Sequence, residues 1–241
     1  ATAATSFVLQ RATGAAGAFA TITSPAGTAT QYDDTGLTLG TQYRYRLAAV
    51  RAAGTSAYST EATATTAGVG SIEVTADITA NTTWTAANVY RIKGFRKVAN
   101  GATLTIEAGT RIEGDFATVG SSLFVLRGAR IVANGTATNP IVFTSSQTAG
   151  TRQSGDWGGL IIVGNGIINR SGVVNIEGTG TSADNALVPY SGGNNNADNS
   201  GTLRYVRIEF AGYATATDAE LNTLTLAAVG SGTTLEYVQS L

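Results

Sequence analysis

The sequence predicts an all-β protein in which a partial antiparallel sandwich is followed by a right-handed parallel β-helix. Three observations favour this fold class. Short runs of β-branched, aromatic and aliphatic residues recur along the chain, and Gly, Asn and Pro separate them at turn-like intervals. From about residue 72 onward, apolar triplets repeat in similar settings, which is typical of stacked coils. The 241 residues also include 39 Ala, 38 Thr and 30 Gly, and small residues suit tight corners.

Residues 1–66 are predicted to form the sandwich. Its β-rich runs cover residues 7–9, 19–22, 43–50 and 58–65. In the third run, aromatic or aliphatic residues alternate with polar ones, so we expect one face of that strand to be buried. The alternating residues are Tyr43, Tyr45, Leu47 and Ala49. Residues 67–71 are interpreted as a linker to the second domain.

Residues 32–66 contain a recognisable spacing of Leu37, Gly40 and Tyr43, in the arrangement L-x-x-G-x-x-Y. With this spacing, residues 5–66 resemble the second half of a fibronectin type III domain. The resemblance implies two packed sheets, but domains of that family open with two further strands that have no counterpart here. We therefore expect a partial sandwich in which apolar side chains and strand edges are left uncovered.

Residues 72–241 are predicted to form the parallel β-helix. Apolar triplets recur with similar flanking sequences, and each is followed by a second short strand. The triplets begin at Leu104, Leu123 and Leu160, and the second strands contain Ile112, Ile131 and Ile168. We expect the triplets to stack as parallel strands, with their leucines in one core column. A second antiparallel sandwich is the alternative, although strands this short are unusual in sandwiches.

The stretches GATLTIEAGTRIEG, GDWGGLIIVGN and LTLAAVGSGTTLEYV carry a second resemblance. Over residues 72–241 the chain resembles large secreted or surface-anchored bacterial proteins, including lipoproteins. The resemblance implies an extracellular or cell-surface location and supplies no established catalytic residues. Such proteins continue past the last of these motifs, so we expect the β-helix to extend beyond Leu241.

The absence of His and Cys excludes several classes of chemistry. Serine and cysteine triads, thiol redox reactions and the usual zinc and haem sites each need one of these residues. The 15 basic and 16 acidic residues nearly cancel, so no overall field attracts nucleic acid. No apolar stretch approaches the ~20 residues of a transmembrane helix. The chain also lacks Met, which indicates a processed chain or a fragment.

Because parallel β-helices are best known from polysaccharide lyases and hydrolases, clustered carboxylates need attention. A hydrolase uses two carboxyl groups about 5 to 9.5 Å apart. We expect the candidates here to face solvent on strands whose alternate residues point inward, and we predict that the chain is not an enzyme. The candidates are Glu107, Glu113, Asp115, Asp156, Glu177 and Glu209.

A polar run at residues 191–201, SGGNNNADNSG, is rich in oxygen atoms that calcium can coordinate. Asp184, Asn195 and Asp198 are the candidate ligands. The alternative is a polar turn, since Asn and Asp favour left-handed bends and hydrogen-bond their own backbone. No other cofactor is expected.

Residues 91–130 carry a local excess of positive charge, with aromatic residues beside it. Aromatic rings could stack on sugars while the cations meet acidic glycans. The predicted glycan contacts are Trp84, Tyr90, Arg91, Lys93, Phe95 and Lys97. The alternative is a solvated flank in which the aromatic residues close the end of the β-helix.

The favoured function is that of a non-catalytic structural protein, exported by a bacterium, that forms part of a surface fibre, layer or stalk. Its expected partners are further copies of itself, joined head-to-tail through open β-strand edges. Few charges and the absence of oxidisable Cys and Met suit a persistent extracellular scaffold. Two alternatives stay open: an adhesin that binds surface glycans, and a polysaccharide lyase or hydrolase on a β-helix scaffold.

Overall fold

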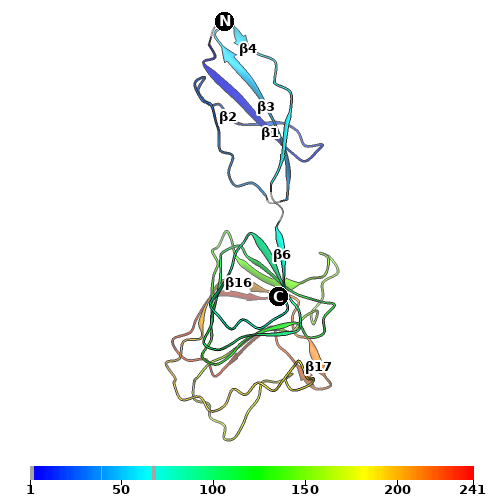
Figure 1. The fold of residues 1–241 in the computed structure, drawn as a ribbon, viewed down its shortest axis with the longest axis vertical. Coiled ribbons are helices and arrows are strands. Elements are labelled where there is room, and N and C mark those ends of the chain that lie inside the picture. Colours follow the sequence, from blue (N-terminus) through cyan, green and yellow to red (C-terminus); the bar gives the residue numbers. More distant parts are fainter. Residues whose placement is uncertain (1–2, 39, 67–68) are drawn as a thin grey trace. The chain divides into compact units, whose positions relative to one another are not determined.

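The computed structural model describes residues 3–38, 40–66 and 69–241, and the chain divides into two units, Ala1–Val69 and Gly70–Leu241. The described residues form strands and irregular segments, which confirms the all-β prediction (Figure 1). They contain no helix, and therefore none that is long and apolar enough to cross a membrane. Of the predicted linker, residues 67 and 68 lie outside the described residues, whereas residues 70 and 71 already belong to a strand of the second unit.

The first unit contains one antiparallel sheet. Its strands are β1 (Ser6–Thr13), β2 (Ala20–Thr23), β3 (Gln42–Arg51), β4 (Gly54–Thr55) and β5 (Ala62–Thr65). β3 pairs with β1 along one edge and with β4 and β5 along the other, and β2 lies outside β1. The register places Phe7 opposite Ala49 and Leu9 opposite Leu47, so these apolar side chains share one face.

The predicted sandwich is not confirmed, because a sandwich needs a second sheet over this apolar face. Within residues 3–38, 40–66 and 69 there is only one sheet. An irregular segment containing Pro25, Tyr32 and Leu37 borders the face instead and leaves a groove of about 570 Å³. Tyr43 is buried as predicted, but Leu47 is 38% exposed. The resemblance to a fibronectin type III domain is therefore also not confirmed.

The opposite face of this sheet is lined by stacked cations and aromatic rings. The guanidinium carbons of Arg44 and Arg46 lie 5.0 and 4.1 Å from the centre of the Phe19 ring. That of Arg46 also lies 4.3 Å from the centre of the Tyr58 ring. Such contacts let long charged side chains cover an apolar surface while their ends stay near water.

The second unit is a parallel β-helix, as predicted. Each coil contributes short strands that pair in parallel with their counterparts in the coils before and after it. The strands are β6 (Gly70–Val74), β7 (Thr82–Trp84), β8 (Asn88–Ile92), β9 (Phe95–Val98), β10 (Thr103–Ile106), β11 (Arg111–Gly114), β12 (Ser122–Val125), β13 (Arg130–Asn134), β14 (Ile141–Ser145), β15 (Gly159–Val163), β16 (Gly201–Ile208), β17 (Ala214–Ala216), β18 (Ala219–Glu220), β19 (Leu224–Ala227) and β20 (Thr234–Ser240).

Three columns of stacked strands make up the β-helix. One column is β7-β10-β13-β16, the second is β6-β8-β11-β14-β16 and the third is β9-β12-β15-β19. β16 runs along the first two columns and bends at Tyr205, whose φ is 48°. β20 pairs with β16, while β17 and β18 form a small antiparallel ribbon.

The predicted stacking of the three apolar triplets is right for two of them. Leu123 lies beside Leu160 on parallel strands. Leu104 instead lies beside Ile131 in a different column, and Ile168 belongs to no strand. All three leucines are fully buried in one interior cluster, so the expected direction of their side chains is correct. The coils differ in length, so a constant offset along the sequence does not identify neighbours.

The β-helix has a second apolar cluster on its outside. We call residues 164–200, between β15 and β16, the insertion. Its side chains Ile176 and Val188 pack with Phe124 and Ile161 on the outer face of the third column. β12 and β15 are consequently buried on both faces, which accounts for their continuous apolar sequences.

Candidate functional site

The six predicted glycan contacts do not form one surface. Trp84, at the end of β7, and Tyr90, on β8, lie in the interior cluster, where their rings stack with centroids 4.7 Å apart. Phe95, on β9, packs in the outer cluster with its ring centroid 6.5 Å from that of Phe124. The three side chains are 3%, 5% and 6% exposed, in chain order. Their ring faces are therefore not available to a sugar, which corrects this part of the glycan hypothesis.

The three cations among the six predicted glycan contacts do not lie on one column of strands. Arg91 belongs to β8 and Lys93 follows it, whereas Lys97 belongs to β9 and lies beside Phe124 on the outside of the third column. The backbone N–H of Lys97 donates a hydrogen bond to Asp77 Oδ1 over 3.0 Å. Sequence proximity therefore misleads here, because the chain turns a corner between Lys93 and Phe95.

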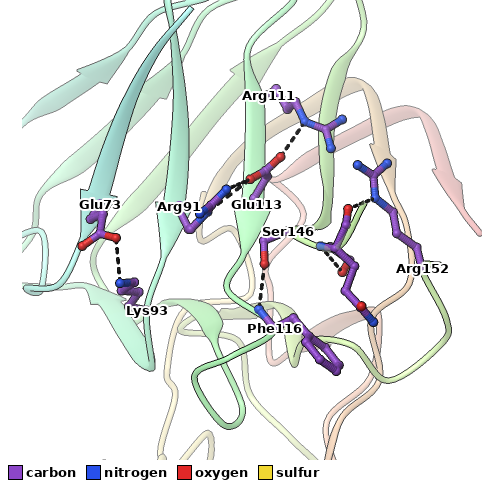
Figure 2. Close-up of polar contacts among 10 residues, drawn as sticks. Glu73, Arg91, Lys93, Arg111, Glu113, Phe116, Ser146 and Arg152 are labelled. Atoms are coloured by element: carbon purple, nitrogen blue, oxygen red, sulfur yellow. Dashed lines mark hydrogen bonds and ion pairs between the residues drawn. The ribbon is translucent and has the colours of Figure 1, made fainter. Parts of the chain in front are cut away.

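A row of alternating charges crosses the outer face of β6, β8 and β11 (Figure 2). The parallel register places Glu73 beside Arg91 and Arg91 beside Glu113. Arg91 Nη2 donates to Glu113 Oε2 and Arg111 Nε donates to Glu113 Oε1, each over 2.9 Å. Lys93 Nζ lies 2.7 Å from Glu73 Oε1. Opposite charges thus meet across neighbouring coils, and we call these five residues the charge row.

Arg91 on β8 and Lys93, which follows β8, are both stabilised in their charged forms. The pKa of Arg91 is raised, chiefly by its hydrogen bond to Glu113, and burial opposes this shift. The pKa of Lys93 is raised, chiefly by its hydrogen bond to Glu73. A general base must be deprotonated at the working pH so that it can accept a proton. The raised pKa values favour the protonated forms of Arg91 and Lys93, which is the opposite of what a lyase base needs.

Four of the six candidate carboxylates are buried, contrary to the expectation that they face solvent. Each of them can be buried because it bonds to a donor of the same chain. Glu113, Asp115, Asp156 and Glu209 are 8%, 7%, 7% and 6% exposed. Their partners are Arg91 and Arg111 for Glu113, Thr118 for Asp115, Gln147 and Gln153 for Asp156, and Arg207 for Glu209. Glu107 and Glu177 are exposed, as expected.

A loop after β14 lies beside the charge row. Ser146 Oγ accepts a hydrogen bond from the backbone N–H of Phe116 over 2.9 Å, and Arg152 Nε donates to the backbone oxygen of Gln147 over 2.8 Å (Figure 2). Trp157 follows this loop, is 1% exposed and donates from Nε1 to the backbone oxygen of Glu209 over 2.8 Å. The polar groups of this region are thus used mainly to hold loops against coils.

Comparison with known proteins identifies the family of the second unit. A family model described as "Pectate-lyase like beta helix domain" matches residues 76–241. The chain belongs to the pectate-lyase-like beta helix domain family. No curated protein and no solved structure matches the chain significantly.

A metal site in this pectate-lyase-like beta helix domain would need several converging oxygen ligands. In the part of the chain that the structure describes, no group of three or more His, Cys, Asp or Glu residues is placed to hold a metal ion. Asp198 Oδ2 accepts hydrogen bonds from Asn165 N and Ser200 Oγ, each over 3.1 Å. Asn195 Oδ1 accepts one from Ala197 N over 3.0 Å, and Asp184 lies exposed on another turn. These bonds match the polar-turn interpretation, and calcium binding stays a prediction.

Sequence reasoning missed one concave site on the pectate-lyase-like beta helix domain. A pocket of about 370 Å³ lies between the insertion and β19. Glu177, considered only as a catalytic carboxylate, lines it together with Arg170 and Asn222. Nothing in the sequence brings these residues together, because the fold of the insertion back over the third column is what creates the pocket.

Proposed function

We propose that the chain is a non-catalytic structural part of an exported bacterial surface protein. This proposal rests on one observation: four of the candidate carboxylates are buried and bonded within the chain. A lyase or hydrolase needs carboxyl groups that reach the substrate, whereas Glu113, Asp115, Asp156 and Glu209 are buried and bonded to donors of the same chain. A pectate-lyase-like β-helix is also compatible with a polysaccharide-active scaffold, so the assay below compares the two functions directly.

We further propose that copies of the chain associate through β-strand edges in a surface fibre, layer or stalk. Two features of the first unit support this. Its outer strands β2 and β5 each pair with a single neighbour among the described residues. Its apolar face is bordered by a groove, which is the kind of surface that a second sheet covers in a fibronectin type III domain.

The catalytic alternative is tested with the purified chain and polyuronate or neutral polysaccharides. We expect no unsaturated products and no new reducing ends, both for the unchanged chain and for the variants Glu113→Gln and Asp115→Asn. Turnover that either substitution abolishes would contradict the proposal and assign the carboxylate a catalytic role. Light scattering of the same samples reports whether the chain associates.

A further inference from the structure

The pocket between the insertion and β19 is built from two distant parts of the chain. The insertion contributes Arg170, residues 174–177 and Tyr190, and the other wall consists of Asn222 and residues 225–228. Its volume of about 370 Å³ lies in the range of small-ligand sites. None of its residues belongs to the charge row.

Hydrogen bonds fix the insertion both internally and against the β-helix. Within the insertion, Ile176 N donates to Val188 O, and Tyr190 N donates to Val174 O, both over 2.9 Å. Arg127 Nη2 donates to the backbone oxygen of Tyr190 over 2.9 Å from the turn after β12. Because Ile176 and Val188 are also buried in the outer cluster, the wall of the pocket is fixed in place. A ligand therefore meets a site that is already formed, which lowers the ordering cost of binding.

The polar side chains of this pocket have unused hydrogen-bonding capacity. Those of Arg170, Asn175, Glu177 and Asn222 make no hydrogen bond or ion pair with any residue that the structure describes. The charge row differs, since its cations all meet carboxylates. Three of these residues, Arg170, Glu177 and Asn222, are exposed, so their donors and acceptors are accessible to a ligand in the pocket.

The chemistry of the pocket suits a sugar ring. Ile176, Ala227 and the partly exposed Leu226 give it an apolar part, against which the C–H face of a pyranose can pack. Arg170 can donate to hydroxyl groups and Glu177 can accept from them. Arg170 and Glu177 both lie on the insertion wall, and their opposite charges favour an uncharged ligand, because a polyuronate would place carboxylates near Glu177.

We propose that this pocket binds a neutral glycan through one of its sugar rings, with Arg170 and Glu177 as the two principal hydrogen-bonding residues. The inference does not depend on self-association or on the absence of catalysis. It adds a binding activity and places it away from residues 84–97, the possible glycan contacts suggested by the sequence.

Binding is tested with the 241-residue chain and neutral oligosaccharides of glucose, mannose, xylose and galactose, with oligogalacturonates as the acidic comparison. We expect at least one neutral series to bind in calorimetry. Glu177→Gln and Arg170→Gln should each weaken that binding about tenfold or more, since each removes a charge-assisted hydrogen bond. Glu107→Gln, at an exposed position outside the pocket, is the matched control and should leave the Kd unchanged.

Three results would overturn the proposal. They are no binding of any neutral oligosaccharide, binding of oligogalacturonates only, and binding that both pocket variants retain. Near-ultraviolet circular dichroism of each variant verifies that it is folded, so a loss of binding is attributed to the pocket.

Discussion

Glu113 illustrates how a residue that suggests catalysis serves the fold instead. It lies on the outside of β11, yet both of its oxygens are occupied by arginines, one on the neighbouring coil and one on its own strand. Those arginine side chains are 36% and 33% exposed, so solvent screens the attraction in part. The ion pairs therefore contribute modestly to stability, and only the one between Arg91 and Glu113 links β8 to β11.

Replacing Glu113 by Gln should lower the free energy of unfolding of the β-helix by about 1 kcal/mol, because two arginines then lose their counter-charge. The measurement is denaturant unfolding followed by tryptophan fluorescence. This signal reports the second unit alone, since both tryptophans, Trp84 and Trp157, lie in its core. The loss should shrink at high salt. Equal stability of Glu113→Gln and the exposed control Glu107→Gln would contradict the argument.

Tyr45 provides a pH-dependent prediction for the first unit. Its pKa is raised to about 12, first by burial and then by its hydrogen bond to Asp34. Between pH 10 and 12 the unfolded chain loses this proton while the folded chain keeps it. Stability should therefore be unaffected by this group below pH 10 and should fall as pH rises through that window. Urea unfolding followed by circular dichroism measures the slope, which should be smaller in Tyr45→Phe. The same slope in both proteins would count against the shift.

At the scale of elements, stability depends on strands that are buried from both sides. Leu123 points into the interior cluster, while its neighbour Phe124 points into the outer one. Neighbouring residues on one strand of the third column therefore pack in two different apolar clusters, one on each side of the strand. The insertion is consequently part of the folded core, although it contains no strand among those assigned.

Leu123→Ala should destabilise the β-helix by about 2 to 5 kcal/mol, because a fully buried side chain is replaced by a cavity. Leu187→Ala is the matched control: this leucine is 60% exposed, and we expect a change of less than about 0.5 kcal/mol. Tryptophan fluorescence in denaturant measures both. Similar midpoints for the two variants would show that Leu123 is not in a packed core.

The sequence was sufficient to predict stacked parallel strands but not their register. Leu104, Leu123 and Leu160 all have apolar neighbours and point inward, yet three columns share the same pattern of short apolar strands. Unequal coil lengths then placed Leu104 in another column. Burial of Trp84 and Tyr90 was also hard to foresee, because an aromatic residue beside cations fits a core position and a surface site equally well. In the first unit, the alternation in β3 predicted an apolar face correctly, but not whether another sheet covers it.

For the whole molecule, the proposed association depends on the strand edges and the apolar face of the first unit. We expect light scattering to show association of the unchanged chain that increases with concentration. Leu47→Lys should shift the distribution toward monomer, because a charge on this face, where Leu47 is 38% exposed, opposes its covering by another chain. Val173→Lys, at a position 79% exposed in the insertion, is the control and should leave association unchanged. A monomeric unchanged chain at micromolar concentration would contradict the proposal.

The outer cluster also has a consequence for the order in which the protein can be made. Phe124 and Ile161 are covered by Ile176 and Val188, which come later in the chain. During synthesis from the N-terminus, the outer face of β12 and β15 is therefore bare until the second half of the insertion has emerged. Exposed apolar strands in that interval are a hazard for aggregation. How long this face needs protection then depends on when the insertion emerges, and not on the stability of the finished fold.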